Sequence, residues 1–132
     1  MVVLCIVLAG AFYPLELTDV PAWRIRVLDQ TGQPVSGVVL RQYWKNYTLE
    51  TEPGENTEEK QSDVNGYVQF ERRSTTASIA QRIVRGTLRF IAQLSHASVG
   101  VSSRVVVLES LTTLDYEPGQ PLAQDVKVFR VK

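Results

Sequence analysis

His96 is the residue best suited to acid–base chemistry, because it is the only histidine in the chain and a histidine side chain titrates close to neutral pH. A nucleophile–base pair also needs a third group that orients the base. The flanking residues Ser95, Ala97 and Ser98 supply no such group, and no G-x-S-x-G elbow occurs in the sequence. We therefore expect His96 to cap a helix end or bond a turn, and we predict that the chain is not an enzyme.

The sequence contains few groups of residues that could coordinate a metal ion. Asp63 and Asn65 look like the start of a calcium loop, but such a loop needs six or more oxygen ligands, including a late glutamate, and Tyr67 follows instead. A tight turn is the better interpretation, because the adjoining glycine can take a positive φ. A single cysteine, Cys5, can form neither a zinc site with His96 nor an internal disulfide. We predict no metal site and no cofactor.

Aromatic side chains offer a different chemistry, because flat rings can stack on sugar rings. Tyr43, Trp44 and Tyr47 lie close together in a stretch that is rich in strand-forming residues. In a strand, Tyr43 and Tyr47 share one face and Trp44 takes the other, so the three rings would not form one platform. Packing within a sheet is the plainer role, and a glycan- or small-molecule-binding surface is the alternative. Asn46 and Thr48 also fit an N-glycosylation sequon, which matters only in a eukaryotic secretory pathway.

Three arginines form a row on a helix that we expect at about 77–94. Their spacing places Arg82, Arg85 and Arg89 together on one side of the helix, opposite a broad apolar face. That face consists of Ile79, Ala80, Ile83, Val84, Leu88, Phe90, Ile91 and Leu94. We expect the apolar face to pack on a sheet and the arginines to be solvated. Pairing of the arginine row with an acidic loop, or with anionic lipid headgroups, is the alternative.

Charges of opposite sign are segregated along the chain. The segment 50–63 carries six acidic residues against Lys60 alone, whereas no acidic residue occurs from Arg72 to Leu108. We expect a loop over 50–63, either flexible and solvated or paired with the helix arginines within one molecule or between two. Exposed ion pairs contribute only about 0–1 kcal/mol each, so the solvated loop is the preferred interpretation.

The elements that would position these residues are mostly strands. From residue 22 to residue 29, apolar and charged side chains alternate, which is typical of a half-buried strand. Further strands are predicted over 37–49, 67–72, 99–108 and 125–131. Ser74, Thr75 and Thr76 are candidates for the helix N-cap. The sequence therefore predicts a mainly β chain, an antiparallel β-sandwich with one amphipathic helix.

Two segments of the sequence carry a family resemblance. They are V-L-D-Q-T-G-Q-P-V-S-G-V-V-L at 27–40 and S-D-V-N-G-Y-V-Q-F at 62–70. They resemble the signature segments of carboxypeptidase regulatory-like domains, which belong to the transthyretin-like (prealbumin-like) β-sandwiches. The resemblance covers about residues 23–72. It implies an accessory or binding module, because in carboxypeptidases this domain lies beside the catalytic one. The related hydroxyisourate hydrolases depend on several histidines and a C-terminal Y-R-G-S segment, whereas this chain ends in V-F-R-V-K.

The first residues resemble a secretory signal peptide. Val2 to Leu8 are apolar, and residues 9–11 supply an A-x-A pattern, although no Lys or Arg precedes them. The apolar stretch is shorter than the about 20 residues that span a membrane. A first buried strand and a truncated membrane anchor are the alternatives. We expect residues 1–20 to be an export signal or N-terminal anchor and residues 21–132 to be the carboxypeptidase regulatory-like β-sandwich domain.

The formal net charge is zero, with 14 basic and 14 acidic residues, so no basic excess favours nucleic acid as a partner. The predicted function is a non-enzymatic exported module, either secreted, periplasmic or membrane-anchored. It would bind a protein partner or support an envelope-associated assembly, and binding of a glycan or small molecule is the alternative. Membrane association through the N-terminus and weak homo-oligomerisation through an exposed edge strand are further expectations.

Overall fold

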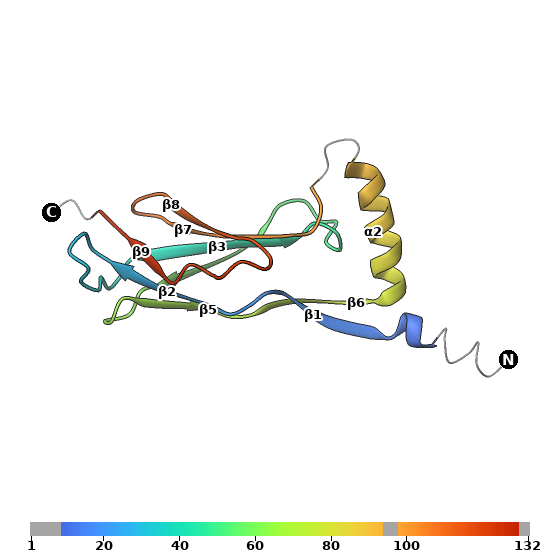
Figure 1. The fold of residues 1–132 in the computed structure, drawn as a ribbon, viewed down its shortest axis with the longest axis horizontal. Coiled ribbons are helices and arrows are strands. Elements are labelled where there is room, and N and C mark those ends of the chain that lie inside the picture. Colours follow the sequence, from blue (N-terminus) through green and yellow to red (C-terminus); the bar gives the residue numbers. More distant parts are fainter. Residues whose placement is uncertain (1–8, 94–97, 130–132) are drawn as a thin grey trace.

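The fold was obtained as a computed structural model, which describes residues 9–93 and 98–129 (Figure 1). It is mainly β, as predicted. The strands are β1 (Pro14–Val20), β2 (Trp23–Leu28), β3 (Val39–Asn46), β4 (Asn56–Gln61), β5 (Tyr67–Phe70), β6 (Arg73–Ser78), β7 (Val101–Val107), β8 (Thr112–Tyr116) and β9 (Asp125–Lys127). The helix α2 (Ile79–Gln93) lies between β6 and β7, and residues 9–12 form a helical turn before β1.

Two sheets enclose the core. One has the strand order β5-β2-β9 and the other the order β4-β3-β7-β8. Alternate residues of each strand face inward, so the apolar side chains of the two sheets meet in one cluster. That cluster consists of Trp23, Ile25, Val27, Val35, Val38, Leu40, Val68, Phe70, Val105, Val107, Val126 and Val128. A β-sandwich is the result, in agreement with the predicted class.

A third, two-stranded sheet leaves one end of the sandwich (Figure 1). Its strands β1 and β6 pair antiparallel from Pro14 opposite Ser78 to Val20 opposite Arg73. The helical turn 9–12 precedes β1 and α2 follows β6, so both lie at the same end of this ribbon, where Pro14 is opposite Ser78. Residues 14–20, which the sequence analysis grouped with the N-terminal segment, therefore form a strand of the fold, and Val20 is fully buried.

The sheets depart from the sequence-based expectations in the direction of one pairing and in four strands that were not predicted, namely β1, β4, β6 and β8. The pairing of β2 with β9 is parallel, so the sandwich is not wholly antiparallel. The prediction of a loop over 50–63 was wrong for residues 56–61, which form β4. As an edge strand, β4 hydrogen-bonds to β3 alone and can carry exposed charges. Its residues Glu59 and Glu58 form ion pairs with Arg41 and Arg73, respectively.

Two D-x-x-G turns are held by their aspartates. Asp29 Oδ1 accepts hydrogen bonds from the Thr31 hydroxyl at 2.7 Å and from the backbone N–H groups of Thr31 and Gln33 at 2.8 and 2.9 Å. The Thr31 hydroxyl, and after it the Gln33 N–H, lower the pKa of Asp29 below its usual 3.8. Asp63 Oδ1 accepts in the same way from the backbone N–H groups of Asn65 and Tyr67, both at 2.8 Å. The segment at 63–66 thus has the geometry of a tight turn.

The helix α2 starts with a reciprocal cap. Ser78 Oγ accepts a hydrogen bond from the Gln81 N–H at 3.2 Å, and Gln81 Oε1 accepts one from the Ser78 N–H at 3.0 Å. This is the capping-box arrangement. The helix lies within the range expected for it, but the N-cap candidates at 74–76 were wrong, because those residues belong to β6.

The orientation of α2 is the reverse of the predicted one. No residue of the helix is buried, and its large apolar side chains are exposed. The arginine side of the helix instead faces the rest of the molecule. Arg82 donates to the backbone carbonyls of Leu15 and Thr75, both at 3.0 Å, and Arg85 donates to the carbonyl of Leu49. These backbone carbonyls thus accept charge-assisted hydrogen bonds from the arginines. The apolar face of α2 has no partner among the described residues.

Candidate functional site

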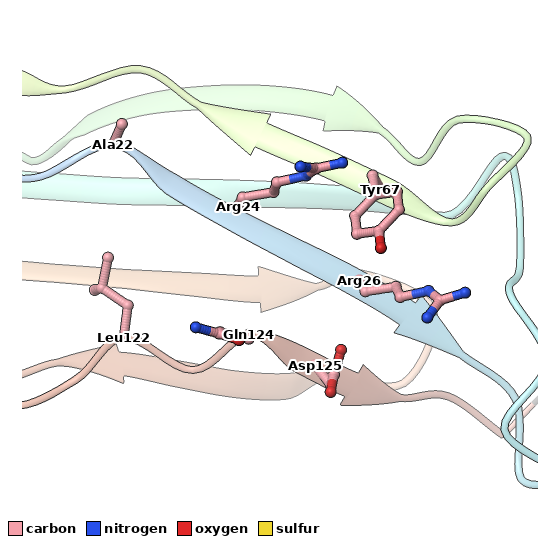
Figure 2. Close-up of a pocket in the computed structure, with 7 residues that line it drawn as sticks. All are labelled: Ala22, Arg24, Arg26, Tyr67, Leu122, Gln124 and Asp125. Carbon is pink, nitrogen blue, oxygen red and sulfur yellow. The ribbon is translucent and has the colours of Figure 1, made fainter.

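A cavity of about 440 Å³ opens on the outer face of the sheet β5-β2-β9 (Figure 2). Three neighbouring strands supply most of its polar groups. Arg24 and Arg26 come from β2, Tyr67 from β5 and Asp125 from β9. The remaining lining residues are Ala22, Leu122 and Gln124. Residues almost 100 positions apart in the sequence therefore converge on one site.

The alternation of β2 explains why its arginines line the cavity. Trp23, Ile25 and Val27 are fully buried in the core, so the residues between them must lie on the outer face. Tyr67 is the direct partner of Arg26 in the antiparallel register of β2 and β5. The three side chains are therefore brought together by strand pairing alone.

The two guanidinium groups lie against the same aromatic ring. The Cζ atom of Arg24 is 4.0 Å from the centroid of the Tyr67 ring, and that of Arg26 is 5.3 Å from it. Figure 2 shows the ring between the two arginine side chains. Both distances fall within the range of cation–π attraction. The tyrosine thus holds two like charges close together.

Neither arginine has an ion-pair partner among the described residues. The Nε atom of Arg26 is buried and makes no hydrogen bond within the described ranges, although a buried donor without an acceptor is unfavourable. Asp125 is paired with Arg26 in the parallel register of β2 and β9. Its carboxylate nevertheless forms no ion pair with that guanidinium. The cavity therefore has unused hydrogen-bond donors of positive charge.

The groups in this cavity are suited to binding. A guanidinium stays protonated at all ordinary pH values and presents several N–H donors in one plane. The Asp125 carboxylate and the Gln124 amide can accept hydrogen bonds from a ligand. The arrangement can therefore hold an anionic group at the arginines and hydroxyl groups near β9.

The aromatic residues singled out in the sequence do not form one surface. Trp44 lies with its ring under the Arg73 guanidinium, at 3.9 Å from the ring centroid. Tyr43 is on the opposite face of β3, beside Arg104, whose Cζ is 5.0 Å from the ring centroid. Tyr47 follows β3 and donates its hydroxyl to Glu55 at 3.1 Å. Burial and that hydrogen bond raise the pKa of Tyr47 above its usual 10.0.

The residue that covers Trp44 also satisfies a buried polar group. Arg73 donates from Nη2 to Gln42 Oε1 at 2.8 Å and pairs with Glu58. Gln42 is fully buried, and its Nε2 donates to Ser103 Oγ at 3.3 Å. The inner face of the four-stranded sheet is thus closed by a polar network at the end from which the β1–β6 ribbon leaves.

The predicted arginine row stays together on a face of α2 that is only partly solvated. Arg82 donates a hydrogen bond to a backbone carbonyl of the ribbon, and Arg85 donates one to a backbone carbonyl of the sandwich. Arg89 lies on the same side of α2 and is half-buried. Arg85 is exposed, whereas Arg82 and Arg89 are half-buried, so the row is solvated only in part. The sequence predicted the apolar face of α2 but not its exposure.

We call this exposed apolar surface the apolar end. Its side chains come from α2 and from the residues around the helical turn 9–12, and each is 43–68% exposed. They are Phe12, Tyr13, Ile79, Ile83, Val84, Leu88, Phe90 and Ile91. Phe12 and Val84 line one shallow groove of about 290 Å³, so the N-terminal turn and the helix form a continuous surface. Large exposed apolar patches of this kind are typical of interaction sites.

The side chain of Asn46, the first residue of the sequon, is buried and hydrogen-bonded. Its Nδ2 atom donates to Asp19 Oδ1 at 2.8 Å, and its Oδ1 atom accepts from the Thr48 and Leu49 N–H groups at 3.2 Å. Its side chain therefore holds the end of β3 against β1 and is not available for attachment of a glycan in the folded chain.

Two residues considered in the sequence, His96 and Cys5, lie outside the described residues. Within residues 9–93 and 98–129, no group of three or more His, Cys, Asp or Glu side chains is placed to hold a metal ion. The same residues contain no helix that is long and apolar enough to cross a membrane.

Comparison of the chain with protein-family models, with curated proteins and with solved structures found no match.

Proposed function

We propose that this protein is a non-enzymatic, exported interaction module that is held at a membrane surface by its apolar end. The sandwich would project from that surface and bind a protein partner or support an assembly of the cell envelope. The observation that carries the proposal is the outward-facing apolar side of α2. No other described element covers it.

A lipid bilayer is the occupant that best fits the apolar end. In the sequence, the residues Val2 to Leu8, which precede the helical turn 9–12, are also apolar. An amphipathic helix binds a bilayer interface by burying its apolar face in the acyl region. Two weak apolar attachments, which are each insufficient alone, together give stable anchoring.

The position of the arginines makes this attachment mainly apolar. Arg82 and Arg85 donate to carbonyls of the protein. Arg85 is nevertheless exposed and lines the groove of the apolar end, so these hydrogen bonds occupy only part of its donor capacity and reduce its availability to lipid phosphates. We therefore expect membrane affinity to depend little on anionic lipid or on salt. The alternative in which the arginine row meets anionic headgroups requires the opposite dependence.

We further propose that the sandwich is of the transthyretin-like type, as a carboxypeptidase regulatory-like domain. Both signature segments support this proposal, since each ends a strand in a D-x-x-G turn whose aspartate accepts backbone N–H groups. Such domains are accessory modules, which agrees with an interaction role.

The membrane proposal predicts a large effect of polar substitutions on the apolar end. In Ile83→Ser/Phe90→Ser, binding of the full chain to phosphatidylcholine vesicles should fall at least about a hundredfold, because each buried side chain of this size contributes about 1.5–3 kcal/mol. Flotation with vesicles measures the bound fraction. Both side chains are more than 60% exposed in the free protein, so the variant should fold normally.

Val64→Ser is the matched control, because Val64 is 85% exposed but lies in the turn before β5 at the far end of the sandwich. It should bind vesicles as the unchanged chain does. Equal flotation of Ile83→Ser/Phe90→Ser and the unchanged chain would sink the proposal. So would a stable dimer in solution that buries α2 and leaves no affinity for vesicles.

The second candidate function is the binding of a glycan or small molecule. The surface predicted for it is divided, because Tyr43 and Trp44 lie on opposite faces of β3 and Tyr47 follows that strand. The cavity over β2 is the feature that favours a ligand-binding role, because its two arginines form no ion pair with the described acidic side chains.

A further inference from the structure

We infer that the cavity over β2 binds an acidic saccharide, with the sugar carboxylate at Arg24 and Arg26 and sugar hydroxyls at Asp125 and Gln124. This inference deepens the second candidate function and does not depend on membrane attachment. It rests on the convergence of three strands on two unpaired guanidinium groups.

The anionic part of the ligand follows from the arginines. Their side chains lie at positions two apart on one strand, so their Cα atoms are about 6.6 Å from each other. The Tyr67 ring holds both cations at its surface and leaves their N–H donors free. Planar guanidinium groups match the geometry of a carboxylate and form bidentate hydrogen bonds with it.

The Nε atom of Arg26 is a donor without an acceptor among the described residues. Because this atom is buried, a ligand oxygen would reach it only after a shift of the Arg26 side chain, so the anion is assigned to the terminal N–H groups of the two guanidiniums. By contrast, the arginines of the four-stranded sheet already have acidic partners. Arg41 pairs with Glu59, and Arg104 pairs with Glu55 at 2.8 Å.

The hydroxyl part of the ligand follows from the β9 side of the cavity. Asp125 would repel a compact inorganic anion that filled the space next to it. A ligand that has hydroxyl donors on the side away from its carboxylate can satisfy both the Asp125 carboxylate and the arginines. Sugar acids have this distribution of groups. The Arg24 guanidinium lies over the Tyr67 ring, so that face of the ring is taken and does not stack on the sugar.

Titration of the purified full chain with sodium glucuronate, without lipid, tests the inference. We expect a dissociation constant of about 1 mM, which is ordinary for a ligand of this size. Backbone NMR shifts should be confined to residues 22–28, Tyr67 and residues 122–127, which include the lining of the cavity. Glucose, which lacks the carboxylate, should bind at least tenfold more weakly. Acetate and phosphate, which lack the sugar hydroxyls, should also bind more weakly.

Arg24→Gln/Arg26→Gln should weaken glucuronate binding at least about tenfold, because it removes both charge-assisted contacts. Arg41→Gln is the matched control, since this arginine also lies beside a tyrosine, at 5.9 Å from the Tyr43 centroid, but in the other sheet. It should leave glucuronate affinity unchanged.

Equal affinities for glucuronate and glucose, or unchanged glucuronate binding by the double variant, would overturn the inference. Stronger binding of phosphate than of glucuronate would overturn the saccharide assignment as well. Since no vesicle is present, each of these results leaves the proposal of membrane attachment as it stands.

Discussion

Trp23→Ala is expected to lower the free energy of unfolding by about 3–5 kcal/mol, which is the usual cost of removing a fully buried large aromatic side chain. Trp23 is 0% exposed and lies at the start of the central strand β2, between the two sheets. Its indole Nε1 donates to the carbonyl of Ala123 at 2.7 Å. The substitution therefore leaves a cavity and also removes the donor to the segment that precedes β9.

Urea unfolding followed by far-UV circular dichroism measures this loss. Trp23→Phe separates the two contributions, because it keeps most of the ring volume and removes only the hydrogen bond and some packing. We expect this variant to lose about 1–2 kcal/mol. Equal stabilities of Trp23→Ala and the unchanged chain would contradict the position of β2 between two packed sheets.

Gly66→Ala is expected to destabilise the fold by about 2–4 kcal/mol through backbone strain and a steric clash. Gly66 has a φ of +79°, and a Cβ atom placed there would lie 2.6 Å from the Val27 carbonyl oxygen. That oxygen accepts a hydrogen bond from the Val35 N–H at 3.0 Å, and the Val27 N–H donates to the Gly66 carbonyl at 2.7 Å. Neither neighbour can move without loss of these bonds.

The other D-x-x-G turn provides the control. Gly32 has a φ of +83°, but a Cβ atom at that position would meet nothing within 4 Å. Gly32→Ala should therefore cost only the strain of the left-handed conformation, about 1–2 kcal/mol. A melting temperature that falls equally in the two variants would show that close packing at Gly66 does not contribute to stability.

The parts of the fold that could be predicted are those marked by a pattern among residues close together in the sequence. The alternation in residues 22–29 fixes which side chains of β2 enter the core. The two D-x-x-G turns mark where strands reverse. The bounds of α2 follow from periodicity over many residues. Each of these features depends on neighbours within a few positions, so one sequence contains the necessary information.

The orientation of α2 could not be predicted in the same way. Periodicity shows that a helix has an apolar side and a polar side, and burial of the apolar side is the usual outcome. In this structure the polar side of α2 faces the rest of the protein, because Arg82 and Arg85 donate hydrogen bonds to backbone carbonyls. These carbonyls belong to Leu15, Thr75 and Leu49. Those carbonyls become neighbours of the helix only in the tertiary structure.

The strand β4 was missed because its sequence, N-T-E-E-K-Q, has no apolar face. Its backbone pairs with β3 over residues Val39–Trp44, and that pairing needs no buried side chain at the edge of a sheet. Strand prediction from hydrophobic alternation therefore fails at such an edge.

The cavity over β2 left a partial signal in the sequence. The alternation places Arg24 and Arg26 on one outer face, and Tyr67 directly follows a turn glycine. What the sequence lacked was the order of the strands. Only the pairings of β2 with both β5 and β9 bring Tyr67 and Asp125 to the same arginines.

The parallel pairing of β2 with β9 has a mechanical consequence. The two strands run in the same direction, and hydrogen bonds join them from Arg26 N to Gln124 O and from Val128 N to Leu28 O. Tension that pulls β2 by its N-terminal end and β9 by its C-terminal end would draw the strands past each other. All of these hydrogen bonds would then bear the load at once, in shear, rather than opening one after another.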